Sequence, residues 1–183
     1  METPVKILSN YQPRNNFPSH ISSKRGETLF LLDFTRTLLK QHEISRHPRE
    51  MKLFRELELN GFGISDLLLY EFSRSTDKNE FKRQTLTVFE IKIKDWRKAI
   101  QQAFRYRYYA NRSIVVIPLE NIRSAKNNLS VFQELKVGLW GYDRQSKRVF
   151  KYYTPKLQKP FSLKAKGKAL QIINKEVRSQ QFF

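Results

Sequence analysis

The segment Phe89-Glu90-Ile91-Lys92-Ile93 combines residue types that could carry out metal-assisted hydrolysis. On a β-strand alternate side chains point to opposite faces, so the apolar residues would enter the core while Glu90 and Lys92 project together on the other side. Asp66 opens an earlier apolar segment and could converge with Glu90 if the two segments pair. Two carboxylates and the Ile91 carbonyl would form an oxygen-rich site suited to Mg²⁺ or Mn²⁺. Lys92 would orient a water or neutralise charge that grows on a phosphate.

Hydrophobic patterns predict the elements that would position these residues. Asp66 and Glu90 fall in two strands joined by a polar hairpin loop. Asp95 is the expected N-cap of the next helix, on which Gln102 and Tyr106 are one turn apart and would lean toward the strands together. The predicted elements are helices at 26–41, 95–111 and 127–134 and strands at 66–72, 84–93, 113–118, 137–142 and 148–153, while 47–60 fits either a helix or a strand.

The composition limits the classes of protein to which this chain can belong. The 183 residues suit one domain, and 35 Lys and Arg against 17 Asp and Glu give a formal net charge of +18. No cysteine is present, which excludes disulfides, thiolate metal sites and cysteine nucleophiles. No apolar run approaches the roughly 18 residues of a membrane span, and the first residues lack a signal-peptide pattern. We therefore expect a cytoplasmic, nucleic-acid-associated protein without a membrane partner.

The positive charge is concentrated toward the C-terminus. Residues 145–183 contain ten basic side chains and one acidic one, Glu176, so they carry half of the net charge. Lysines interleaved with aromatic residues are typical of an arm that contacts phosphates and stacks on bases, although a solubilising tail would have the same charge. The candidate nucleic-acid-binding residues are Arg105, Arg107, Lys147, Arg148, Lys151, Lys164, Lys166 and Lys168, with a solvated helix face over buried rings as the alternative for the two arginines.

This arrangement resembles the PD-(D/E)XK nuclease superfamily, and is closest to its small DNA-repair-like members. Asp66 takes the place of the first aspartate of the motif, Glu90-Ile91-Lys92 that of E-x-K, and Gln102 with Tyr106 that of a Q-x-x-x-Y helix. Ser65 replaces the usual proline before the aspartate. The supporting acid of the family is either Glu27 or Glu56, and the resemblance covers roughly residues 26–153.

The resemblance implies an α/β fold with a restriction-endonuclease-like core, namely a helix, a three-stranded meander, a helix and a strand. Residues 1–25 would form an irregular N-terminal segment, 26–153 the nuclease-like domain, and 154–183 a basic C-terminal extension. The implied activity is metal-dependent hydrolysis of phosphodiester bonds, in DNA rather than RNA, by an endo- or exonuclease, with a second copy of the chain or a helicase- or transposase-type protein as a candidate partner.

Three alternatives stay open at this stage. The first is a non-catalytic nucleic-acid-binding protein that retains the nuclease fold, as a repair or mobile-element accessory. The second is a basic RNA- or ribosome-associated protein without a carboxylate cluster. In the third, Glu90 and Lys92 belong to a solvated strand face that pairs with charges on the neighbouring strand.

Overall fold

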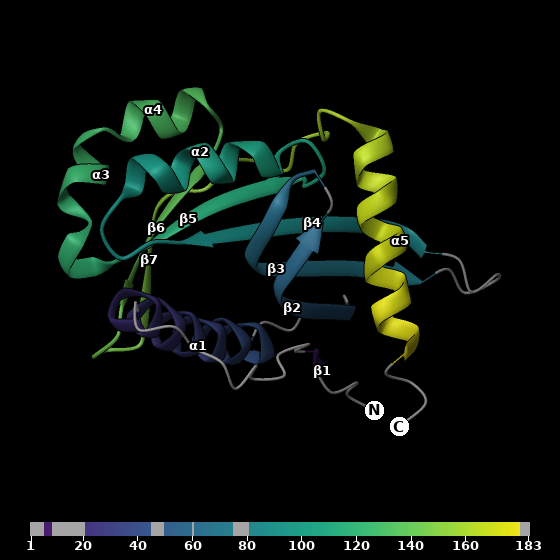
Figure 1. The fold of residues 1–183 in the computed structure, drawn as a ribbon, viewed down its shortest axis with the longest axis horizontal. Coiled ribbons are helices and arrows are strands. Elements are labelled where there is room, and N and C mark those ends of the chain that lie inside the picture. The colour runs from purple at the N-terminus through teal and green to yellow at the C-terminus, as the bar shows by residue number, and fades with distance from the viewer. Residues whose placement is uncertain (1–5, 9–20, 45–49, 60, 75–80, 180–183) are drawn as a thin grey trace.

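The computed structural model describes residues 6–8, 21–44, 50–59, 61–74 and 81–179 of the chain. These residues form a mixed β-sheet with helices on both faces, so the expected α/β class is confirmed (Figure 1). The elements in chain order are β1 (Lys6–Leu8), α1 (Ile21–Ile44), β2 (Glu50–Leu59), β3 (Gly63–Arg74), β4 (Phe81–Ile91), α2 (Trp96–Tyr106), β5 (Arg112–Pro118), the 3₁₀ turn η1 (Leu119–Asn121), α3 (Arg123–Asn127), α4 (Leu129–Glu134), β6 (Gly138–Asp143), β7 (Arg148–Tyr153) and α5 (Leu163–Ser179).

The spatial order of the strands follows their order in the chain. β2, β3 and β4 form an antiparallel meander, whereas β4, β5 and β6 are parallel to one another. β7 pairs antiparallel to β6, and the short β1 pairs parallel to β2 at the other edge. A parallel pair needs a crossover, and α2 supplies it between β4 and β5. The predicted order of helix, strands, helix and strand is therefore present.

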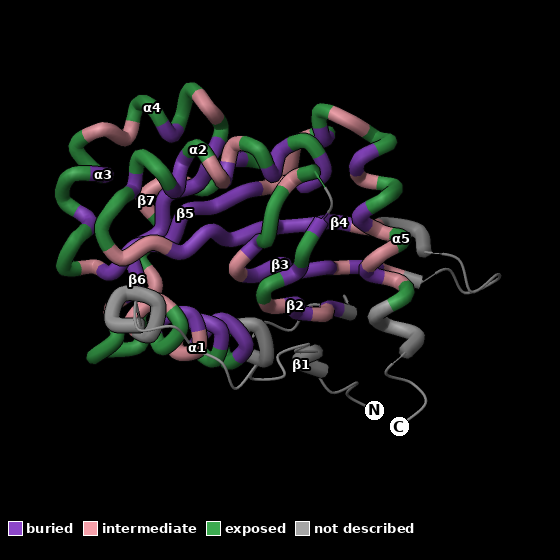
Figure 2. The backbone as a smooth tube through the Cα atoms, in the orientation of Figure 1, coloured by how far each residue is buried: buried purple, intermediate pink, exposed green. Residues whose placement is uncertain are grey.

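Three core clusters explain why the apolar residues form these elements. Phe30 and Phe34 of α1 pack on one face of the sheet with Phe89 and Ile91 of β4. On the opposite face, α2 packs against β5 and β6. α5 covers the remaining part of that face, where Ala169 joins the cluster formed by β2, β3 and β4. Figure 2 shows the resulting pattern, in which the central strands are buried and the helices expose their outer sides.

Several helices and strands begin or end at residues other than the predicted ones. The ambiguous segment 47–60 contains a strand, β2, and its first residues 47–49 lie outside the described part. α1 begins at Ile21, inside the segment expected to be irregular, and β1 also falls there, while residues 1–5 and 9–20 of that segment are not described. α2 ends at Tyr106 because the amides of the next residues bond to carbonyls three residues back instead of four. The helix expected at 127–134 corresponds to α4, and α3 precedes it.

The region expected to be a basic extension is part of the packed fold. In α5, Ala165, Ala169 and Ile173 are buried and recur at helical spacing, so the helix has an apolar stripe that faces the sheet. Lys164 and Lys168 of the same helix are exposed. α5 therefore both completes the core and presents positive charge to solvent.

Glu56 interrupts the regular alternation of β2. Its backbone φ of +50° lies in the left-handed region, which is unfavourable for a residue with a side chain. Before this point, Leu53 belongs to the α1 cluster and Phe54 to the cluster under α5; after it, Leu57 and Leu59 both belong to the cluster under α5. The strained residue thus shifts the alternation by one position, which turns Leu57 to the α5 side of the sheet.

Candidate active site

The predicted carboxylates lie on neighbouring strands. The pairs Arg55–Leu67 and Leu57–Ser65 bracket Glu56 and Asp66, which places these two acids opposite each other on β2 and β3. On the other side, Asp66 Oδ2 accepts a hydrogen bond of 2.7 Å from the backbone N–H of Ile91 on β4. The meander thus brings together acids that are far apart in the sequence.

Burial and neighbouring negative charges raise the pKa of both central acids. Glu90 is only 1% exposed, and burial together with the charge of Asp66 raises its pKa to about 8. Burial raises the pKa of Asp66 to about 6, against the opposing effects of the Ile91 N–H and Lys92. Asp66 is partly buried and Glu90 is buried, and a cation would offset the free-energy cost of ionising both carboxyl groups. We call these two residues the buried pair.

Tyr106 connects the end of α2 to Glu90. Its hydroxyl oxygen lies 2.8 Å from Glu90 Oε2 and 2.9 Å from the carbonyl oxygen of Ile64. Because a hydroxyl has one proton, it can donate to only one of these acceptors at a time. When Tyr106 donates to Ile64, a protonated Glu90 can donate to Tyr106, so the geometry accommodates the neutral carboxyl. Burial and the charge of Glu90 raise the pKa of Tyr106, which therefore stays a phenol.

Lys92 follows β4 directly and is held at the edge of the site. Its Nζ lies 3.4 Å from Glu27 Oε2 on α1, and its backbone N–H donates to Val116 of β5. The charge of Lys92 lowers the pKa of both Asp66 and Glu90, whereas that of Glu27 raises both. Lys92 is thus shared between one peripheral carboxylate and the buried pair.

Both candidates for the supporting acid are close to the buried pair. Glu27 pairs with Lys92, and Glu56 lies opposite Asp66 and raises its pKa. Glu56 is exposed on its strand, whereas Glu27 is partly buried. Sequence reasoning left the two open, and the structure gives each a separate place around the same site.

Gln102, one turn before Tyr106 in α2, contains a buried side-chain oxygen. Among the described residues, Gln102 Oε1 has no hydrogen-bond partner. A buried acceptor without a donor is costly by about 1–3 kcal/mol. The atom therefore requires a donor from outside the described residues, such as a water molecule.

A divalent cation at this site would depend on the oxygen atoms of Asp66 and Glu90. Among the described residues, no three His, Cys, Asp or Glu side chains form a ready-made metal-binding group. Mg²⁺ does not need such a group, since it is usually held by one or two carboxylates together with waters and substrate phosphates. Asp66 and Glu90 each use one oxygen in a described hydrogen bond, which leaves Asp66 Oδ1 and Glu90 Oε1 for a ligand. The residues present fit Mg²⁺ or Mn²⁺ in that minimal form.

Two of the predicted phosphate-binding residues have structural roles. Arg107 is buried, donates from Nη1 to the carbonyl of Leu135 at 2.8 Å and lies over the ring of Phe161. Lys166 donates from Nζ to Gln84 O and Asn111 Oδ1. Both cations make intramolecular hydrogen bonds in this arrangement, and their contact with a nucleic acid stays a prediction.

The other predicted cations lie on different parts of the surface. Arg105, Arg148, Lys164 and Lys168 are exposed. Lys151 is exposed and lies over the ring of Trp140, with Nζ 4.8 Å from the ring centroid. These residues remain available to an anionic partner.

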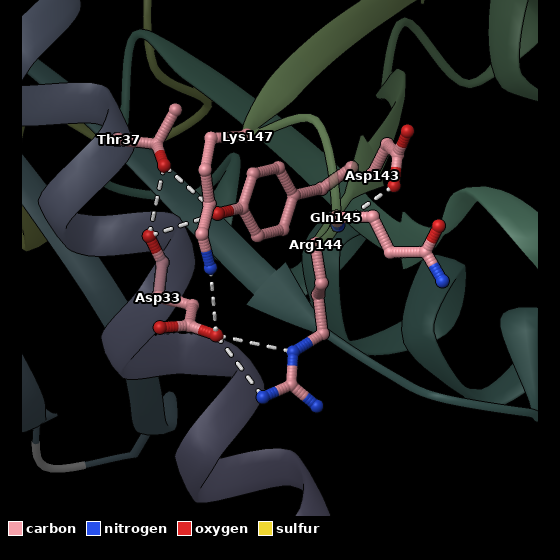
Figure 3. Close-up of polar contacts among 7 residues, drawn as sticks. Asp33, Thr37, Asp143, Arg144, Gln145 and Lys147 are labelled. Carbon is pink, nitrogen blue, oxygen red and sulfur yellow. Dashed lines mark hydrogen bonds and ion pairs between the residues drawn. The ribbon is translucent and has the colours of Figure 1, made fainter.

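Lys147 belongs to a polar cluster between α1 and the β6–β7 turn (Figure 3). Asp33 accepts two bonds from Arg144 and pairs with Lys147 at 3.4 Å. An open pocket of about 730 Å³ lies here, and its lining includes Glu120 and Asp143 but neither carboxylate of the buried pair. This hollow is therefore separate from the candidate chemistry, and Asp33, Arg144 and Lys147 in its lining are paired with one another.

None of the described helices combines the length and the apolar composition required to cross a bilayer. Comparisons of the chain with protein-family models, with curated proteins and with solved structures each found no match. The functional interpretation therefore depends on the geometry of the site itself.

Proposed function

We propose that this protein is a metal-dependent nuclease that hydrolyses phosphodiester bonds, in DNA rather than RNA. One observation carries the proposal: the partly buried Asp66 and the buried Glu90 lie side by side on adjacent strands, with Lys92 close enough to stabilise the ionised form of both. The order of α1, the β2–β3–β4 meander, α2 and β5 also matches the order expected of a restriction-endonuclease-like core. The net charge of +18 favours a polyanionic substrate.

Each residue has a distinct proposed role. Asp66 and Glu90, with the carbonyl of Ile91, would hold the cation, which when bound supplies Lewis-acid stabilisation of charge on the phosphate. Lys92 would hold the attacking water or stabilise the developing negative charge, and its release from Glu27 would free it for that contact. Tyr106 positions Glu90 through its hydroxyl. The buried Oε1 of Gln102 would accept a hydrogen bond from a water at the site.

The test compares two neighbouring lysines. Purified protein is incubated with labelled single-stranded, duplex and branched DNA, and with RNA, in Mg²⁺, in Mn²⁺ and in chelator. Lys92→Ala should abolish cleavage while it leaves DNA binding intact, whereas Lys94→Ala, which alters an exposed lysine two residues away, should retain cleavage. Cleavage that survives both Lys92→Ala and chelation would contradict the mechanism.

A non-catalytic binding protein with the same fold predicts a different result. Isothermal titration with Mn²⁺ should detect a site in the wild-type protein that Asp66→Asn weakens, since the amide keeps an acceptor for the Ile91 N–H but loses the charge. A protein that binds DNA but shows no Mn²⁺ site would have only the binding function.

A further inference from the structure

Tyr108 and Phe161 form an exposed aromatic pair where the end of α2 meets the start of α5. Tyr108 follows the end of α2 and Phe161 precedes α5, and they are 45% and 51% exposed. Their ring centroids are 5.5 Å apart with an interplanar angle of 85°. We call these two residues the aromatic shelf. Aromatic side chains usually bury most of their surface, so two adjacent exposed rings mark a binding surface.

The aromatic shelf is held in place by the surrounding backbone. The N–H of Phe161 donates to the carbonyl of Arg107, and the N–H of Ser162 donates to that of Tyr108, both at 3.0 Å. These bonds tie the start of α5 to the end of α2, and the two helices lie on the same side of the sheet in Figure 1. The buried guanidinium of Arg107 lies 4.3 Å from the centroid of the Phe161 ring. The rings are thus preorganised, which lowers the entropic cost of binding a ligand.

A row of ring contacts connects the aromatic shelf to the carboxylates. Tyr106, whose hydroxyl bonds Glu90, lies 6.0 Å from Tyr109, measured between ring centroids. Tyr109 lies 5.5 Å from Phe62, and Phe62 lies 5.9 Å from Tyr108. The aromatic shelf is therefore continuous with the site through packed side chains.

The positive charge around the aromatic shelf favours an anionic partner. Residues 96–118 contain five basic and no acidic side chains, and residues 154–175 contain six basic and no acidic ones. Lys159, Lys164 and Lys168 are exposed in the second segment. Exposed rings beside lysines match a ligand that presents both flat apolar faces and phosphates. In a paired duplex the base faces are stacked on one another, whereas an unpaired strand leaves them accessible.

We propose that the aromatic shelf stacks on bases of single-stranded DNA, so that the substrate contains an unpaired segment beside the bond to be cleaved. The proposal rests on the nuclease function for the choice of DNA and of a cleaved substrate. Tyr108 and Phe161 contact the bases, and Lys164 and Lys168 contact the phosphates. The buried Arg107 packs against the Phe161 ring and holds it in place.

The experiment measures binding without cleavage. Fluorescence anisotropy is recorded in EDTA with a labelled single strand and with the duplex of the same sequence at one fixed salt concentration, because affinity for phosphates depends on salt. Tyr108→Leu/Phe161→Leu keeps apolar packing but removes the rings, and should weaken single-strand binding about tenfold or more while it changes duplex binding less than twofold. Phe150→Leu, which alters a ring that is 39% exposed on β7, should change neither. Tyr108→Phe/Phe161→Tyr should restore binding, and thermal unfolding checks that each variant folds.

Several results would overturn this proposal. These are unchanged single-strand affinity in a folded Leu/Leu variant, an equal loss for both substrates, or a wild-type preference for the duplex. Tighter binding to single-stranded RNA would overturn the assignment to DNA, and loss of self-association without loss of DNA binding would identify the shelf as an interface between copies. The binding assay contains no metal, so it tests the aromatic shelf independently of cleavage. If binding depends on the shelf but the protein cleaves no substrate when metal is present, the nuclease function is rejected and the binding proposal stands.

Discussion

The buried pair of carboxyl groups should make the stability of the metal-free protein depend on pH in an unusual direction. The pKa of Glu90 is raised from 4.5 to about 8 in the folded chain. Between these values the unfolded chain releases its proton while the folded protein retains it, so stability is greatest below the unfolded pKa and falls as the pH rises through the folded pKa. Asp66 contributes in the same direction over the lower part of this range, because its pKa is raised to about 6.

The expected size follows from the shift at Glu90. One pKa unit corresponds to 1.36 kcal/mol, so the free energy of unfolding should fall by about 3–5 kcal/mol between pH 4.5 and pH 8. Glu90→Gln keeps the shape and an acceptor for Tyr106 but cannot ionise. The variant should show a flatter pH profile than the wild-type protein and should be more stable than it at pH 8–9.

The assay is urea unfolding in EDTA, followed by circular dichroism and tryptophan fluorescence at several pH values. Glu134→Gln alters an exposed acid of α4 and should keep the wild-type profile. Mg²⁺ or Mn²⁺ should raise the stability of the wild-type protein at pH 8 by about 3 kcal/mol at a hundredfold excess over Kd, and should stabilise Glu90→Gln much less. Parallel pH profiles for the wild-type protein and Glu90→Gln would refute the burial argument.

Three further outcomes can be checked with single or paired variants. Tyr106→Phe removes the hydroxyl between Glu90 and Ile64 and should lower the free energy of unfolding by about 1–3 kcal/mol. Any loss of cleavage in this variant should be smaller at high metal concentration. An unchanged free energy of unfolding in urea would contradict the role of the hydroxyl. Glu56→Gly should raise the melting temperature, since glycine relieves about 1 kcal/mol of strain at φ +50°, and a lower value would show that the carboxylate itself is required. Lys164→Gln with Lys168→Gln should lower DNA affinity and reduce the slope of log affinity against log salt by about two, with little change in thermal stability because both side chains are exposed; an unchanged slope would exclude them from the interface.

Local sequence patterns were sufficient to predict the central elements of the fold. The alternation around Glu90, the cap at Asp95 and the helical spacing of Gln102 and Tyr106 each depend on residues close in the chain. These periodicities follow from backbone geometry, so a single sequence can display them. Because the strands form a meander with chain order equal to sheet order, the acid on β3 and the acid on β4 became neighbours without any long-range rearrangement.

The surroundings of the site could not be predicted in the same way. The supporting acid was left open between Glu27, the positional candidate, and Glu56, its rival, because their distances from Lys92 and Asp66 depend on how α1 and β2 pack against the meander. The left-handed backbone at Glu56 has no local signal, since no glycine or asparagine occurs there.

The sequence by itself determined the charge, the α/β pattern and the spacing of Asp66, Glu90 and Lys92, because composition and short-range periodicity are properties of the chain alone. Only the tertiary structure decided which cations face solvent. Arg107, which the sequence pattern placed on the surface, is buried beneath Phe161, and the basic segment after residue 153 contains a helix that completes the core. Burial depends on which elements meet, and that information is distributed over contacts between distant parts of the chain.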